Sequence, residues 1–145
     1  MLRSTVVLFL FLVHIPAFAQ TEDFPDVIGV WAGSYNVAFP EDHSHFSSEI
    51  KGVQMELHIT HQDGNLFWAQ NRWSLDGHTD WHVENGTGTF DLLDRSSLSI
   101  VETSPDPEYG STGYFLGKLV DGKLYLSYLG SGRGISFATV LQRKP

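Results

Sequence analysis

The chain of 145 residues contains no cysteine. This absence excludes disulfide bonds, thiolate catalysis, cysteine-ligated metal sites and a lipid anchor on cysteine. Basic residues are also few, with 9 Lys and Arg against 17 Asp and Glu, so the formal net charge is −8. A surface of this sign repels nucleic acid and anionic lipid. Neither is therefore expected as a partner.

The longest apolar run lies at the N-terminus and is too short for a membrane span. Arg3 precedes an apolar segment over residues 6–15, and an Ala-Phe-Ala sequence ends at Ala19, before polar residues begin at Gln20. A charged start, a short apolar core and an Ala-x-Ala exit are typical of a secretory signal peptide, whereas a transmembrane helix needs about 20 apolar residues. The sequence predicts a signal peptide at 1–19, one domain at 20–145, and a secreted or periplasmic location without membrane association after cleavage.

Beyond that segment no helical apolar period of useful length occurs, but short alternating segments recur, separated by Gly, Asp, Asn and Pro. Alternation of this kind indicates half-buried β-strands. The sequence predicts an all-β fold with eight strands, at residues 28–39, 52–60, 65–73, 86–92, 96–102, 112–120, 123–129 and 134–142.

The turn at Asp121-Gly122 sets the register of one hairpin, because Gly supplies the positive φ that a two-residue turn needs. Turn chemistry and hydrophobic pattern agree there. They place three pairs on one face: Leu119 with Leu124, Gly117 with Leu126, and Phe115 with Tyr128.

The hairpin around residues 61–64 has two possible registers. A three-residue bulged loop places Phe67, Ala69 and Trp73 inward, whereas a two-residue loop places Trp68 inward instead. The first register is preferred because it keeps Arg72 out of the core.

In an up-and-down meander, alternate connections lie at opposite ends of the barrel. Three tight turns therefore share a closed end, and four longer loops form a mouth, at residues 40–45, 76–82, 104–109 and 130–133. Binding residues concentrate on such loops. An eight-stranded barrel either holds one small ligand or fills its interior with side chains.

The segment Gly29-Val30-Trp31-Ala32-Gly33 resembles the G-x-W opening of the calycins, the group that contains lipocalins and avidins. Together with residues 62–67 and 137–143, it is similar to lipocalin-like or avidin-like barrels of secreted bacterial proteins, whose functions are largely unassigned. The resemblance implies a closed calycin-like barrel in which Trp31 packs at the closed end beneath Arg143. It does not imply biotin binding, because Gly33 and Val37 stand where avidins carry the Asn and Ser that hold the ureido group.

Aromatic residues make up 13% of the chain. Eight are predicted to point inward: Trp31, Tyr35, Phe67, Trp73, Phe90, Phe115, Tyr128 and Phe137. They either fill a small barrel or line a cavity toward the mouth, since small-molecule sites have large apolar walls with a few polar groups. The candidate ligand-binding residues are Tyr35, Trp73, Phe115, Tyr128 and, from a mouth loop, Trp81. The acidic residues of the mouth loops favour an apolar ligand that is neutral or cationic.

Histidines gather in the mouth loops beside acidic residues. Imidazole with carboxylate suits zinc or copper, so the candidate metal ligands are His43, His45, His78 and His82. His58 is predicted to face outward and His61 to lie in a closed-end turn. The absence of any cofactor is the main prediction, and a zinc or copper ion at the mouth is the alternative.

No motif of a known catalytic site is present, so catalysis is the weaker hypothesis. Three hypotheses remain. The first is a non-catalytic barrel that binds a small molecule. The second is an interaction or inhibitor module with a packed interior, which uses the mouth loops to bind a protein partner, and the third is an isomerase or cyclase in which Tyr and Glu polarise a substrate. A cavity inside the barrel would favour the first and third hypotheses over the second. An ionisable group inside it favours the third over the first.

Overall fold

A computed structural model describes residues 23–41, 45–74, 80–104, 112–130 and 134–145, with the backbone alone over 38–41 and 45–50. The predicted signal peptide lies outside these residues. In these ranges no helix is long and apolar enough to cross a membrane. The chain forms eight strands: β1 (Gly29–Glu41), β2 (His45–Asp63), β3 (Leu66–Ser74), β4 (His82–Phe90), β5 (Ser97–Thr103), β6 (Thr112–Val120), β7 (Lys123–Gly130) and β8 (Ser136–Arg143).

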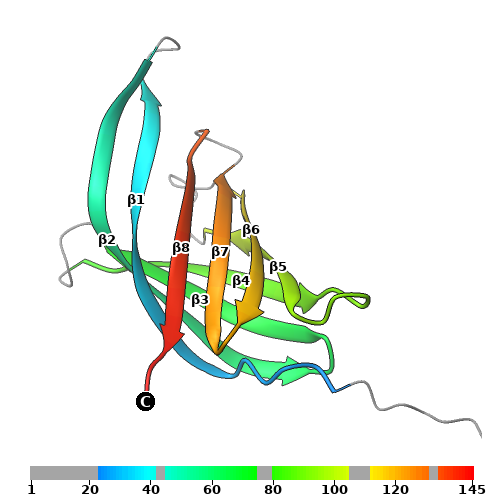
Figure 1. The fold of residues 1–145 in the computed structure, drawn as a ribbon. Helices are drawn as coiled ribbons and strands as arrows, with labels where there is room; N and C mark the ends of the chain where they lie inside the picture. The colour runs from blue at the N-terminus through cyan, green and yellow to red at the C-terminus, as the bar shows by residue number, and fades with distance from the viewer. Residues whose placement is uncertain (1–22, 42–44, 75–79, 105–111, 131–133) are drawn as a thin grey trace, which may run out of the picture.

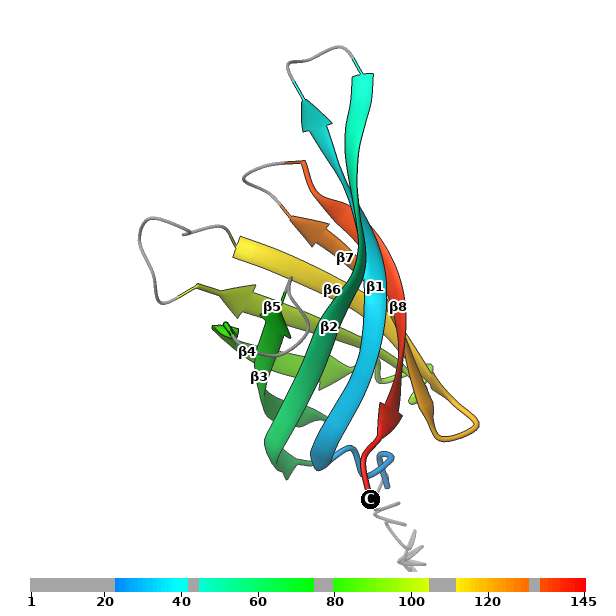
Figure 2. The same ribbon diagram turned by 90° about the vertical axis from the view of Figure 1, so that its left-hand side faces the viewer.

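The strands form one closed barrel in sequence order, with every neighbouring pair antiparallel and β8 paired to β1 (Figure 1). This confirms the predicted all-β, eight-stranded up-and-down barrel, an architecture consistent with the calycins. The connections after β2, β4 and β6 lie at one end of the barrel, and those after β1, β3, β5 and β7 lie at the other. Figure 2 shows β1 and β2 continuing past the mouth as a two-stranded ribbon.

Two predicted strand boundaries are wrong, and interruptions of the alternating pattern explain both. β2 begins at His45 rather than at residue 52, and its ladder with β1 shifts register between Tyr35 and Val37. Such a shift breaks the period of two that the prediction uses. β4 begins at His82 rather than at residue 86, because its pairing with β3 continues through the inward-facing, polar Glu84.

The hairpin between β6 and β7 has the predicted register, including Leu119 opposite Leu124 and Phe115 opposite Tyr128. Asp121 and Gly122 have φ angles of 50° and 72°. Two consecutive positive φ angles are the signature of a type I′ turn, whose twist matches that of the strands.

The hairpin between β2 and β3 places Phe67 and Ala69 in the core, as predicted, and leaves Trp68 exposed. The predicted three-residue loop is wrong, however. Asp63 pairs with Leu66 across a two-residue turn, and the extra residue lies within β2, between Ile59 and His61. A bulge inside the strand restores the facing that a longer loop was expected to supply.

The closed end holds an apolar core around Trp31, which is 2% exposed. Its indole Nε1 donates a hydrogen bond to the Val27 carbonyl at 2.8 Å. The guanidinium carbon of Arg143 lies 4.8 Å from the centre of the indole ring, as the calycin resemblance implies. The neighbouring Gly33 has no room for a side chain, because a Cβ there would lie 2.5 Å from the Val140 carbonyl oxygen. The close approach of β1 and β8 thus depends on this glycine.

Candidate functional site

Toward the mouth, the interior changes from apolar to polar. Five strands each contribute one inward-facing polar side chain to what we call the polar layer: Tyr35 of β1, Asn71 of β3, Glu84 of β4, Glu102 of β5 and Tyr128 of β7. Each of the five is at most 9% exposed. Burying so many polar groups costs free energy unless they are paired with one another. The polar layer is therefore the candidate functional site.

Strand register brings these groups together. Asn71 lies directly opposite Glu84, and Glu102 lies opposite Gly113. A Cβ on Gly113 would lie 2.4 Å from the Tyr128 hydroxyl oxygen, so the glycine leaves room for the end of this tyrosine. The Tyr128 hydroxyl consequently reaches the Glu102 carboxyl and forms a hydrogen bond with it.

The electrostatics of the polar layer centre on Glu102. Burial, followed by the hydrogen bond and the charge of Glu84, raises the pKa of Glu102 to about 9, against the smaller opposing effect of Asn71 and Tyr128. Glu102 therefore carries a proton at neutral pH. Burial and a neighbouring carboxyl both disfavour the ionised form of a carboxyl group.

Two acceptor atoms in the polar layer have no partner. The Asn71 Nδ2 donates to Glu102 Oε2 at 3.0 Å, but Asn71 Oδ1 and Glu102 Oε1 are buried without a hydrogen bond. Leaving a buried polar group unpaired costs about 1–3 kcal/mol. Unpaired groups of this kind are rare in native proteins and call for a specific explanation.

Aromatic rings flank the polar layer. The Phe137 ring stacks on Tyr35 with 3.7 Å between ring centres and on Tyr128 with 4.8 Å. The ring of Phe115, which is fully buried, has its centre 4.9 Å from that of the Tyr128 ring. Burial and the nearby Glu102 and Glu84 carboxyls raise the pKa of Tyr35. The structure thus brings together three of the five predicted ligand-binding residues, Tyr35, Phe115 and Tyr128.

The other two predicted ligand-binding residues lie apart from each other. Trp73 is half-buried on the inner face, where its ring stacks on His82 at 4.1 Å, on the mouth side of Asn71. Trp81 packs against Arg72, whose guanidinium carbon lies 5.2 Å from the centre of the indole ring. A ligand-binding role for Trp73 and Trp81 stays a prediction.

The predicted metal site falls mostly outside the described residues. His43 and His78 are not described, and only the backbone of His45 is. In the described part of the chain, no three His, Asp or Glu side chains are arranged to hold a metal ion. The zinc or copper site stays a prediction. His58 faces outward as expected and pairs with Glu56 at 2.8 Å.

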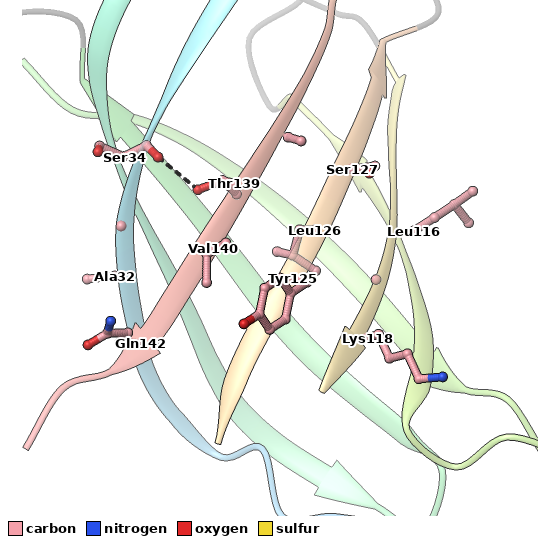
Figure 3. Close-up of a pocket in the computed structure, with 13 residues that line it drawn as sticks. Ala32, Ser34, Leu116, Lys118, Tyr125, Leu126, Ser127, Thr139, Val140 and Gln142 are labelled. Atoms are coloured by element: carbon pink, nitrogen blue, oxygen red, sulfur yellow. Dashed lines mark hydrogen bonds between the residues drawn. The ribbon is translucent and has the colours of Figure 1, made fainter. Parts of the chain in front are cut away.

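A concavity of about 900 Å³ lies on the outer wall, away from the polar layer (Figure 3). It covers the junction of β1 and β8 and extends over β7 to β6. Its lining includes the small residues Ala32 and Ala138 and the larger Tyr125 and Leu116. At the junction, the Thr139 hydroxyl donates to the Ser34 carbonyl at 3.0 Å. No part of this outer wall is among the residues expected to bind a ligand.

Three residues of the polar layer, Asn71, Glu84 and Glu102, were not predicted as site residues. Alternation carried the signal for two of them. If Ala69 and Trp73 face inward, so does Asn71, and Glu102 continues the inward row of β5. Glu84 lay beyond the predicted start of its strand.

Comparisons with known proteins supply no family. No protein-family model and no curated protein sequence matches this chain. Among solved structures, the chain is similar to the fluorescent protein UnaG, with a TM-score of 0.41 and 13% identity over 81% of this chain and 97% of that one. A mutant of UnaG aligns with a TM-score of 0.42 and 12% identity, covering 82% of this chain and 96% of that one. These scores are below 0.5, so the fold assignment rests on the strand pairing of this chain itself.

Proposed function

We propose that this protein is a secreted barrel that binds a small molecule on the polar layer, without catalysis. The ligand has an apolar body and is neutral or cationic. The single observation that carries the proposal is the pair of buried acceptors, Asn71 Oδ1 and Glu102 Oε1, that no protein group satisfies. A ligand that donates to both atoms removes two desolvation penalties at once.

The surroundings of these atoms support a ligand rather than a purely structural role. The Phe137 ring stacks on Tyr35 and Tyr128, and Tyr128 is hydrogen-bonded to Glu102, so an aromatic cluster adjoins these acceptors. Trp73 and His82 stand half-buried on the mouth side, where an entering molecule passes them. A few fixed polar groups in an aromatic wall are the usual composition of a small-molecule site.

Native mass spectrometry tests this proposal. The protein spanning residues 20–145, purified from its own host, is compared before and after denaturation. We expect an additional small-molecule mass in the native spectrum that is lost on denaturation, and a lower occupancy in the Asn71→Leu variant. A zinc or copper mass instead supports the metal site predicted at the histidines of the mouth loops. A ligand-free spectrum from several preparations contradicts the proposal.

A second candidate function is an isomerase or cyclase, which the ionisable groups inside the barrel favour. Glu102 is a protonated carboxylic acid at neutral pH, hydrogen-bonded to Glu84 and Tyr128. Such a group can donate a proton to a substrate. Incubating the recovered ligand with the protein in heavy water distinguishes the two functions. Catalysis incorporates deuterium at a carbon of the ligand in wild type but not in Glu102→Gln, whereas simple binding leaves the carbon-bound hydrogens unchanged.

The interaction-module hypothesis depends on the mouth loops. These lie largely outside the described residues, so the structure adds no contact in its favour.

A further inference from the structure

We propose that the polar layer binds its ligand as a cation with at least two N–H donors, such as an ammonium or an amidinium, held by the unpaired oxygens of Asn71 and Glu102. The inference rests on the proposed binding function and narrows it to one ligand class.

Among the described residues, no lysine or arginine acts on the Glu102 carboxyl. The groups that act on it are Glu84, Asn71 and Tyr128. Of the other described titratable groups, Tyr35 of β1 lies near these carboxyls, and His82 lies against Trp73 on the mouth side. Glu102 itself carries a proton in the unliganded protein. A ligand cation can take the place of that proton.

The two unpaired oxygens determine which hydrogen-bond donors the ligand needs. Once its proton leaves, Glu102 is an acceptor through both carboxyl oxygens. Glu102 Oε1 and Asn71 Oδ1 are then two unpaired acceptors. An ammonium has three donors and an amidinium has four, while an alcohol has one. Only a nitrogen cation satisfies both atoms and the charge together.

The aromatic rings favour the same ligand class. The Phe137 ring stacks on the rings of Tyr35 and Tyr128, so three aromatic rings lie together at the polar layer. Ring faces attract a cation, by about 0.5–2 kcal/mol depending on how far it is desolvated. A ligand carboxylate would instead lie beside the carboxyl groups of Glu84 and Glu102.

The exchange of a proton for a cation makes binding depend on pH. Because Glu102 holds its proton up to a pKa of about 9, a cation competes with that proton at neutral pH. The apparent affinity should therefore rise about tenfold for each pH unit between 6 and 8. One proton is released for each cation bound.

Isothermal titration calorimetry on residues 20–145 tests the inference with four probes of similar shape: 2-phenylethylammonium, benzamidinium, 2-phenylethanol and phenylacetate. Titrations at pH 6, 7 and 8, in two buffers of different ionisation enthalpy, give affinity and proton release together. We expect the two cations to bind at least tenfold more tightly than the alcohol and the acid at pH 8, with one proton released.

Three variants sharpen the result. Glu102→Gln keeps the shape of the carboxyl but cannot ionise, so it should lose at least tenfold in cation affinity at pH 8 and release no proton. Asn71→Leu removes the second acceptor and should weaken both cations while proton release is retained. Glu56→Gln, the same change on the outer face, should leave binding unaltered. Near-ultraviolet circular dichroism checks that each variant is folded.

The outcomes separate the inference from the function beneath it. If 2-phenylethanol binds as tightly as 2-phenylethylammonium, or if cations bind without releasing a proton, the inference is wrong while small-molecule binding stands. If none of the four probes binds and the native mass spectrum shows no ligand, the proposed function is wrong as well.

Discussion

Glu102 shows at the residue scale how a functional group can cost stability. In the unfolded chain a glutamate has a pKa of about 4.3, and in the folded protein burial beside Glu84 raises it to about 9. Between these values the folded state binds more protons than the unfolded state. Glu102 therefore contributes stability that is fully present below about pH 4.3 and is lost as the pH rises toward 9, by at most about 1.4 kcal/mol per pH unit.

This linkage predicts that Glu102→Gln increases the stability of the protein relative to wild type as the pH rises from 5 to 8. Urea denaturation at each pH gives the free energies of unfolding. Glu56 is a matched control, because hydrogen bonds from Lys144 and His58 lower its pKa. Glu56→Gln should lose stability relative to wild type above about pH 4.5. A difference between Glu102→Gln and wild type that stays constant with pH would contradict the argument.

Gly33 is a second decisive residue, for steric reasons. A Cβ at this position would lie 2.5 Å from the Val140 carbonyl oxygen and 2.8 Å from a methyl carbon of Leu141. Since one of these atoms belongs to the backbone, relief requires β1 and β8 to separate. We expect Gly33→Ala to lower the free energy of unfolding by about 1–3 kcal/mol. Ser34→Ala, at the next and exposed position, should change it by less than about 0.5 kcal/mol, as measured by the same denaturation.

At the element scale, the β6–β7 hairpin depends on its turn. Asp121 and Gly122 both have positive φ, a region that costs an L-residue with a Cβ about 1–2 kcal/mol. Gly122→Ala should destabilise the protein by about that amount in thermal or urea unfolding. Asp121→Asn should be neutral or stabilising, because asparagine tolerates this region and Asn-Gly favours type I′ turns. Equal losses in both variants would show that φ is not the cause.

The junction of β1 and β8 closes the barrel with ladder pairs at three positions, Trp31 with Arg143, Ala32 with Gln142, and Ala38 with Ser136. Between them, the Thr139 hydroxyl donates to the Ser34 carbonyl. Thr139→Val keeps the shape and removes this hydrogen bond, so it should cost about 0.5–1.5 kcal/mol. Hydrogen exchange should increase in β8 more than in β4. The exposed Thr87→Val serves as the control, and faster exchange spread evenly over all strands would argue against a role at the junction.

At the scale of the whole molecule, one core with no disulfide holds the barrel together. Intact mass measurement of the protein exported by its host should give a chain that begins at Gln20. A chain that retains residues 1–19 would show that the leader is not cleaved and would remove the main support for secretion.

Local sequence signals determined the architecture of this protein. Alternation set the inner and outer faces of most strands, and Asp121-Gly122 fixed one register, because a strand period of two and a two-residue turn are properties of neighbouring residues. The pairing of Trp31 with Arg143 was also foreseen, through a family resemblance at the two ends of the chain. Tertiary structure decided which polar side chains meet. Asn71, Glu84 and Glu102 come from three strands. The unpaired oxygens of Asn71 and Glu102 and the raised pKa of Glu102 exist only because closure of the barrel buries these side chains against one another.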